Sequence, residues 1–338
     1  MVSTMKQMRA MIVAGAVAVC GIGLVAYDQG GFTSQAAVVT WNMPVPYGDK
    51  NFHTLNHVAF AEDLQKRTGG SVTVKVHPSG SLFKHPDIKN AVRSGQVPIG
   101  EFLLSRLSNE DPIFALDSIP FLADSYEDAE KLWSVARPSV ERLLDKQGLK
   151  VLYAVPWPPQ GLYANKPVPV ASEMAGLKFR AYNSATERLA QLLKAVPTQV
   201  EVADLSQAFS TGRVDAMVTS PSTGYNSKAW DYLSHYYDVQ AWLPKNIVVM
   251  NKAVFESLDK DTQASVLTAA KEAEARGWSA SRKETKTKTE GLAANGIHVS
   301  KPSEGLKSAL VGVGQTMVDE WLSKAGSAGK DIIEEYKK

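Results

Sequence analysis

Residues 176–187, GLKFRAYNSATE, predict a strand that passes directly into a helix. Apolar and basic side chains alternate over 177–181, which is the period-two pattern of a strand. Ser184, with Glu187 three residues later, is the capping box that begins many helices. Arg180 therefore lies at the carboxyl end of the predicted strand, beside the first turn of a helix.

Arg180 is the first candidate for a binding residue. The free N–H groups and the positive end of the helix dipole favour an anion at such a junction. A planar guanidinium holds a carboxylate through two parallel hydrogen bonds. Most arginines are surface or ion-pair residues, but this position favours a ligand role, and we expect Arg180 to bind a carboxylate.

On both sides of this stretch, short apolar runs alternate with longer amphipathic runs, which is typical of α/β folds. A cap at Asp259 begins a helix that continues to residue 294, and at roughly 1.5 Å per residue its length of about 50 Å exceeds one small domain. We expect this helix to span two lobes. Strands are predicted over 38–41, 72–76, 99–104, 149–155, 177–181, 214–218 and 247–250, and the other helices over 52–68, 86–94, 126–147 and 204–211.

The chain is expected to cross between two lobes twice. Residues 156–161, PWPPQG, contain three prolines and a glycine, so neither a helix nor a sheet ladder continues there. A return crossing is predicted near Asn246. The predicted domains are therefore discontinuous, with lobe I formed by 37–157 plus 246–285 and lobe II by 158–245 plus 286–338.

Residues 1–36 predict a cleaved export signal. Two basic residues precede an uncharged run over 10–27, and the small residues of 34–36, SQA, suit a signal peptidase. The mature chain would begin near Ala37 and lie in the periplasm. A retained anchor is the alternative, because the run is almost long enough to span a bilayer. Lipidation of Cys20 is disfavoured by the valine before it.

The composition excludes several classes of partner and chemistry. Cys20 is the only cysteine, so the mature chain has neither a disulfide nor a thiol nucleophile. The net charge is +2, and loss of 1–36, which hold two basic residues and one acidic residue, leaves +1. No block of Lys and Arg with interleaved aromatics is present, and nucleic acid is not an expected partner. No segment after residue 36 is apolar enough to cross a bilayer.

Catalytic and metal motifs are absent from the sequence. It contains no Gly-x-Ser-x-Gly elbow and no phosphate-binding Gly-x4-Gly-Lys-Ser/Thr loop. His53 and His57 have the spacing of two zinc ligands on one helix face, but no third ligand accompanies them. We predict no metal, no cofactor and no enzymatic activity. An enzyme in the same cleft would need a titratable pair, for which His77 and Glu101 are the available residues.

The residues resemble the solute-binding proteins of tripartite ATP-independent periplasmic (TRAP) transporters over nearly the whole mature chain. The most specific match joins 176–180, GLKFR, to 203–216, ADLSQAFSTGRVDA. Supporting matches are 80–82, GSL, 118–122, SIPFL, and 246–251, NIVVMN.

This resemblance implies a type II periplasmic binding-protein fold with two lobes, discontinuous domains and a long helix along both. It implies a monomeric receptor that delivers an organic acid to the small and large membrane subunits of a permease. In that family an arginine at the place of Arg180 pairs with the substrate carboxylate. The chain departs from the sialic-acid receptors, because Gln160 replaces their second arginine and Thr219-Ser220 replaces an asparagine.

The remaining cleft residues are expected near the two crossings. Tryptophan is more often a core residue, but crossings border the cleft of a hinged protein. Glu101 is either paired with a lysine or arginine or placed in the cleft as a hydroxyl acceptor. The predicted site comprises Arg180, Trp157, Gln160, Tyr182, Asn183, Thr219, Ser220, Trp242 and Asn246, with Asn42, Tyr47 and Glu101 from the other lobe.

One guanidinium between flat apolar walls favours an aromatic or a 2-oxo/2-hydroxy monocarboxylate as the ligand. A neutral Gln160 argues against a dicarboxylate that needs two cations. A sugar acid is the alternative, with stacking on tryptophan and with Glu101 and Asn42 binding hydroxyls. A structural envelope protein or an extracytoplasmic sensor is a further alternative class.

Overall fold

The computed structural model describes residues 38–338. The predicted signal peptide, the alternative anchor and Cys20 lie outside the described residues. Among the helices described, none is both long and apolar enough to cross a membrane. The strands and helices predicted from the sequence are found with bounds that differ by a few residues at most.

Lobe I contains a parallel pair of strands, β1 (Val39–Pro44) and β2 (Val72–His77), and a three-stranded sheet. That sheet has the order β3-β10-β4, from β3 (Ile99–Leu103), β10 (Lys245–Asn251) and β4 (Leu149–Pro156), with β10 antiparallel to both neighbours. All three strands are buried almost throughout and are rich in β-branched and aromatic residues, as is usual for central strands. Its helices are α1 (Phe52–Arg67), α2 (Ile88–Arg93), α3 (Tyr126–Asp145) and α7 (Lys252–Ser257).

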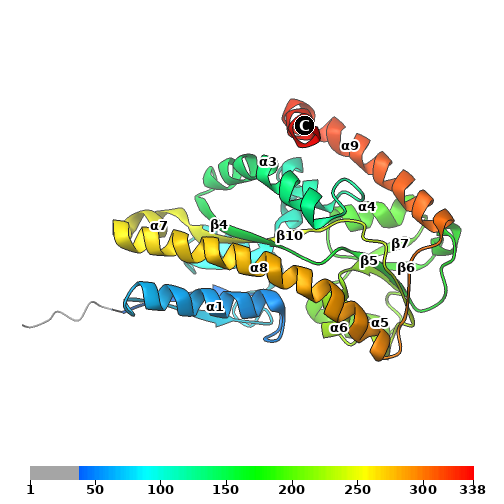
Figure 1. Ribbon diagram of the computed structural model, residues 1–338, viewed down its shortest axis with the longest axis horizontal. Coiled ribbons are helices and arrows are strands. Elements are labelled where there is room, and N and C mark those ends of the chain that lie inside the picture. Colours follow the sequence, from blue (N-terminus) through cyan, green and yellow to red (C-terminus); the bar gives the residue numbers. More distant parts are fainter. Residues whose placement is uncertain (1–37) are drawn as a thin grey trace, which may run out of the picture. The chain divides into compact units, whose positions relative to one another are not determined.

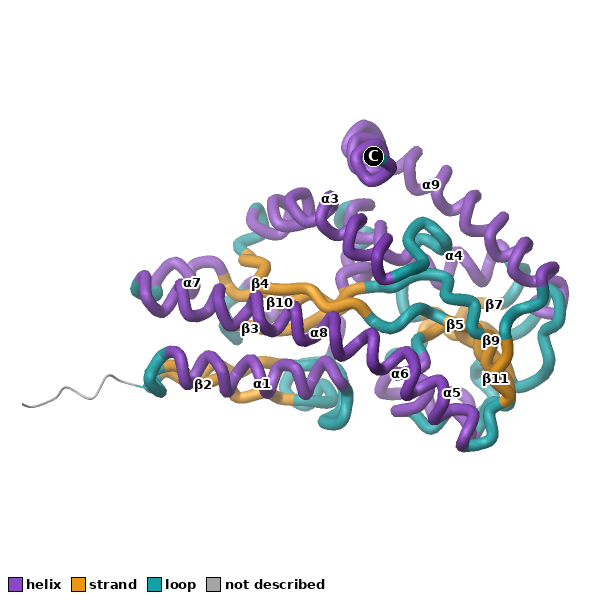
Figure 2. Tube along the Cα trace, in the orientation of Figure 1, coloured by secondary structure: helices purple, strands orange, loops and turns teal. Residues whose placement is uncertain are grey.

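Lobe II is built on a six-stranded mixed sheet with the order β11-β9-β5-β8-β6-β7. Figure 2 shows this group of strands apart from the strands of lobe I. The parallel neighbours β8, β6 and β7 end at the same edge, which places Arg180 of β6 there. The strands are β5 (Gly161–Ala164), β6 (Lys178–Ala181), β7 (Val196–Gln199), β8 (Ala216–Thr219), β9 (His235–Tyr237) and β11 (His298–Ser300), and the helices are α4 (Ser184–Leu192), α5 (Leu205–Ser210) and α6 (Pro221–Asn226).

The two chain crossings between the sheets lie side by side and are hydrogen-bonded to each other. The amide of Trp157 donates to the carbonyl of Pro244 at 2.8 Å, and the amide of Gln160 donates to the carbonyl of Trp242 at 2.9 Å. Prolines in the first crossing cannot donate to a ladder, but these two bonds and a third, from the amide of Ala241 to the carbonyl of Gln160 at 2.9 Å, join the segments. The domain boundaries given above stay a prediction.

Helix α8 (Lys260–Ala294) contacts elements of both lobes (Figure 1). Its first half packs on α1 and β4, and its second half packs on α6. The side chain of Asp259 accepts from the Thr262 amide, which confirms the predicted cap. The helix ends before Gly296, whose φ of 95° suits glycine. Helix α9 (Glu304–Lys337) also contacts both lobes, with a non-helical residue at Gly326.

The predicted capping box of α4 is wrong by one residue. The Asn183 side chain accepts from the Thr186 amide at 2.9 Å, and the Thr186 hydroxyl accepts from the Asn183 amide at 3.1 Å. The box is therefore Asn183 with Thr186 instead of Ser184 with Glu187, because asparagine and threonine satisfy the same free donors one residue earlier.

Helix α8 approaches lobe I closely at Gly277, and this contact gives a testable prediction. A Cβ atom at Gly277 would overlap Val155 of β4 and lie 2.8 Å from Nδ2 of Asn56. Gly277→Ala should lower the free energy of unfolding by about 1–3 kcal/mol, because overpacking forces the helix away from the sheet. Thermal and urea unfolding measure this change.

Gly312→Ala is the matched control within a helix, because a Cβ atom there meets nothing within 4 Å. It should be neutral or stabilising by up to about 1 kcal/mol, as alanine is the better helix former. Equal effects of the two substitutions would contradict the close-approach interpretation.

Candidate functional site: a buried anion-binding pocket

The guanidinium of Arg180 is held in place by its own lobe. Its Nε donates to the carbonyl of Val200 at 3.0 Å, and its Cζ lies 4.7 Å from the centre of the Tyr182 ring. Arg180 is 4% exposed. Nε is the guanidinium nitrogen used in hydrogen bonds to the described residues, so the two terminal nitrogens keep their donors for another group.

Arg180 carries a buried charge without a carboxylate partner. Among residues 38–338, no Asp or Glu oxygen lies within 4.0 Å of its nitrogens, although Glu201 and three phenols are near enough to affect its pKa. Burial lowers the pKa of Arg180 to about 10 because the cation loses hydration. It remains charged at neutral pH. A buried unpaired cation is costly, and an anion from outside the chain would offset that cost.

A pocket with an empty volume of about 440 Å³, which includes space open to solvent, lies next to this guanidinium. Both lobes contribute to its wall. The lining residues are Tyr47, His85, Leu103, Arg106, Trp157, Gln160, Arg180, Tyr182, Glu201, Val202, Thr219, Ser220, Thr223 and Pro244.

A second arginine also lines the pocket, but its charge is neutralised. Nη1 of Arg106 lies 2.9 Å from Oε1 of Glu201, and Nδ1 of His85 lies 3.7 Å from Oε2 of the same carboxylate. Burial alone would raise the pKa of Glu201, but His85 and Arg106 outweigh it and lower that pKa to about 2. The carboxylate is therefore ionised at neutral pH, and Arg180 is left as the free cation among the described lining residues.

Polar contacts join the two lobes beside the pocket. Arg106 follows β3 in lobe I, and Glu201 precedes α5 in lobe II. Nδ2 of Asn183 donates to the hydroxyl of Ser105 at 2.8 Å, and the hydroxyls of Ser108 and Ser184 lie 2.6 Å apart. The two lobes are therefore in contact beside the pocket.

The structure places seven of the twelve predicted residues in the pocket wall. Asn183 instead caps α4 and bonds Ser105, and Trp242 is buried at 1% exposure behind the wall. Asn42 is exposed and bonds Nε2 of His77 at 2.8 Å, so it points away from the site. The seven lining residues are Tyr47, Trp157, Gln160, Arg180, Tyr182, Thr219 and Ser220. Their part in binding stays a prediction.

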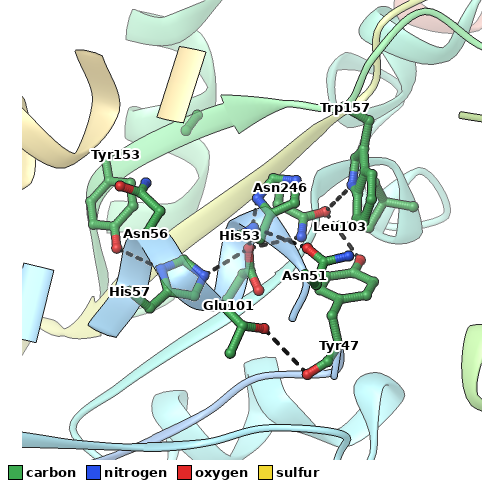
Figure 3. Close-up of polar contacts among 12 residues, drawn as sticks. Tyr47, Asn51, His53, Asn56, His57, Glu101, Leu103, Tyr153, Trp157 and Asn246 are labelled. Atoms are coloured by element: carbon green, nitrogen blue, oxygen red, sulfur yellow. Dashed lines mark hydrogen bonds and ion pairs between the residues drawn. The ribbon is translucent and has the colours of Figure 1, made fainter. Parts of the chain in front are cut away.

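Glu101 and Asn246 belong to a buried polar cluster behind the wall (Figure 3). Nδ2 of Asn246 donates to Oε1 of Glu101 at 2.8 Å. Oε1 also lies 3.2 Å from Nδ1 of His53 and 2.9 Å from Nε2 of His57. Burial alone would raise the pKa of Glu101, but the two histidines lower it, so the carboxylate is ionised.

This cluster corrects two expectations from the sequence. Among residues 38–338, Glu101 is paired with neither a lysine nor an arginine, and it does not line the pocket, because α1 places His53 and His57 against it. The pair that an enzyme would need is not assembled in 38–338, since His77 bonds Asn42 and Glu101 bonds the two histidines. The spacing of His53 and His57 marks a buried structural role in which Nδ1 of His57 also contacts the Tyr153 hydroxyl at 2.8 Å.

Sequence reasoning missed half of the pocket wall. Arg106 follows the end of β3 much as Arg180 ends β6, so the same rule would have selected it. Leu103 ends β3, and the other missed residues lie in loops and short helices, whose side-chain directions have no sequence period. The missed residues are His85, Leu103, Arg106, Glu201, Val202, Thr223 and Pro244.

The neutralised arginine gives a testable prediction. Glu201→Gln should release Arg106 as a second free cation. The variant should therefore bind succinate at least about ten-fold tighter than the wild type does, while its affinity for butyrate should change little. Thermal-shift titration at pH 7 measures both acids. Since the lowered pKa keeps Glu201 ionised, the wild-type preference should be constant between pH 7 and 8, where both test acids are also ionised.

Glu173→Gln is the control, because Glu173 is exposed and lies 3.7 Å from Lys166, away from the pocket. It should leave both titrations unchanged. An unaltered succinate affinity in Glu201→Gln would show that the Arg106 charge does not act on the pocket.

Comparison with known proteins places this geometry in a family. The family model described as "Bacterial extracellular solute-binding protein, family 7" matches residues 47–324. Two extracytoplasmic solute receptors of Bordetella pertussis, both solved binding pyroglutamic acid, are similar over their full length. DctP7 is 44% identical with a TM-score of 0.88, and the similarity covers 89% of this chain and 100% of that chain. DctP6 is 42% identical with a TM-score of 0.87, and the similarity covers 88% of this chain and 99% of that chain.

A third solved structure supports the same relation. A TRAP solute-binding protein from an unidentified marine microbe, specific for pyroglutamate and solved with the co-purified ligand, is 42% identical with a TM-score of 0.88. The similarity covers 89% of this chain and 99% of that chain.

Proposed function

The chain belongs to family 7 of the bacterial extracellular solute-binding proteins, the receptors of TRAP transporters, and from this premise we propose that its pocket captures pyroglutamate or a closely related cyclic monocarboxylate. Members of this family are extracytoplasmic receptors that work with a membrane permease. The observation that carries the proposal is the buried, unpaired guanidinium of Arg180 in a pocket between the lobes.

The charges of the pocket favour one carboxylate on the ligand. Arg180 has two free terminal nitrogens, which suit a bidentate carboxylate. Arg106 is compensated by Glu201, so a second carboxylate would find no free cation among the described lining residues. The rest of the wall is aromatic and apolar around a few hydroxyls and one amide, which suits a small ring.

Three similar receptors with known structures bind pyroglutamate, and their identities of 42–44% extend over nearly the full chains. This supports the small monocarboxylate expected from the sequence. Within that class, a five-membered lactam acid is now preferred to the aromatic and 2-oxo/2-hydroxy acids. No feature of the described pocket specifically favours the sugar-acid alternative.

The finer assignments form part of the same proposal. Residues 1–36 export the chain to the periplasm, and the protein acts as a monomer with the small and large membrane subunits of a permease. The lobes, divided as predicted, open and close about the crossings at Trp157 and Asn246. A ligand bonded to both lobes favours the closed state, because its contacts exist only when the lobes meet.

Substitution of Arg180 tests the proposal directly. Arg180→Ala should weaken L-pyroglutamate binding by about 2–5 kcal/mol, or roughly 30-fold to several thousand-fold in Kd, because the carboxylate is then buried without a counter-charge. Arg180→Lys should lose part of the affinity, since an ammonium cannot form the bidentate pair. Isothermal titration calorimetry on ligand-free protein, prepared by unfolding and refolding, measures these values.

Arg213→Ala is the control, because the Arg213 side chain is exposed and bonds the Gln199 carbonyl outside the pocket. It should bind like the wild type. Undiminished affinity in Arg180→Ala would refute the assigned role of Arg180. Mass spectrometry of the released acid should find it chemically unchanged, as a receptor requires.

A further inference from the structure

The side chain of Asn246 is locked in one orientation behind the pocket wall (Figure 3). Its Oδ1 accepts from Nε1 of Trp157 at 2.9 Å and from the hydroxyl of Tyr47 at 3.2 Å. Its Nδ2 donates to Oε1 of Glu101 at 2.8 Å. Asn246 is 1% exposed and Glu101 is fully buried, so water does not compete for these bonds.

The direction of each bond follows from chemistry. An indole N–H can only donate, and an ionised carboxylate can only accept. Trp157 therefore requires the amide oxygen of Asn246 on its side, and Glu101 requires the amide nitrogen on the other. If the Asn246 amide were flipped, its N–H groups would face the N–H of Trp157 and its oxygen would face the oxygen of Glu101. The Tyr47 hydroxyl shares the oxygen side, so it must donate its proton to Asn246.

This arrangement determines what Tyr47 and Trp157 offer to a ligand. Both residues line the pocket. The single N–H of the Trp157 indole is bonded to Asn246, so Trp157 offers its ring surface to a ligand. The Tyr47 hydroxyl donates its proton to Asn246, so its oxygen has only lone pairs to offer. Burial and the charge of Glu101 raise the pKa of Tyr47 far above its ordinary value, so the phenol stays protonated and the bond to Asn246 persists.

The hydroxyl of the other phenol in the wall, Tyr182, also donates its proton to a side chain of the protein, but it does so in lobe II. The Tyr182 hydroxyl donates to Oε1 of Gln160 at 3.2 Å, and Nε2 of Gln160 donates to the Pro158 carbonyl at 2.9 Å. The Tyr182 ring lies against the Arg180 guanidinium in lobe II. Tyr47 belongs to lobe I, so a ligand that bonds Arg180 and Tyr47 connects the two lobes.

We propose that Tyr47 is a specificity-determining acceptor that selects acids carrying an N–H donor beside the carboxylate, and that Glu101 sets this polarity through Asn246. The inference rests on the proposed function. Pyroglutamate has such a donor in its lactam N–H. A ring oxygen at the same place would bring lone pairs against the lone pairs of Tyr47, and the phenol can turn its proton to the ligand only by giving up its hydrogen bond to Oδ1 of Asn246, which would then accept from Trp157 alone.

The test compares L-pyroglutamate with its lactone analogue, 5-oxotetrahydrofuran-2-carboxylate, in which oxygen replaces the ring N–H. Calorimetry on the wild type should give at least about 100-fold weaker binding of the lactone, because sites built for an N–H reject analogues that lack it. This comparison needs no variant, so a folding defect cannot affect it.

Tyr47→Phe then assigns the acceptor. It should weaken pyroglutamate binding roughly 10- to 100-fold and leave the lactone equal or tighter, so the preference for the lactam collapses. Tyr182→Phe, which removes the other phenol oxygen of the wall, should keep the preference. Melting temperatures of both variants report folding.

The outcomes separate the two proposals. If wild-type protein binds neither acid, the proposed function fails and this inference with it. If it binds both acids equally, the function stands and the inference is overturned. The inference is also overturned if Tyr47→Phe keeps the preference for L-pyroglutamate over the lactone, or if only Tyr182→Phe loses it. Either result would assign the preference to another group.

Discussion

The buried guanidinium of Arg180 is the constraint on which the rest of the site depends. Its hydration is lost, and its own chain supplies one carbonyl and one aromatic ring in return. Such a charge is costly to bury, and an anion in the pocket would offset that cost. Under the proposed function, ligand capture is therefore linked to closure of the lobes, since the anion is enclosed only when they meet.

The pocket wall holds two kinds of charge. Arg180 has no carboxylate partner among the described residues, whereas Arg106 and Glu201 form a pair that joins the lobes. Arg106 and Glu201 form their pair across the cleft, with His85 beside the carboxylate, and add no net cation to the site. A partly exposed pair of this kind contributes little to stability by itself. Under the proposed function its larger effect is on selectivity, because it occupies the second arginine that a dicarboxylate would otherwise use.

Specificity and rigidity have a common origin in the cluster around Glu101. In this cluster Oε2 of Glu101 and Nε2 of His53 have no hydrogen-bond partner among the described residues, but the three bonds of the Asn246 side chain are made out of water. This holds two wall residues from different segments, Tyr47 and Trp157, in fixed orientations. Under the proposed function, this network therefore also determines which faces of these residues the ligand meets.

The sequence by itself determined the features that depend on near neighbours in the chain. Alternation over 177–181 placed Arg180 at a strand end, prolines marked the crossing at Trp157, and Asp259 marked the start of α8. Tertiary structure decided what distant segments form together. Glu101 meets Asn246 because antiparallel pairing of β3 and β10 sets Glu101 opposite Val248 and Leu103 opposite Asn246, on one face. Periodicity and capping are local hydrogen-bonding effects, whereas this register depends on the packing of the whole sheet, and a shift of one residue would turn both side chains away.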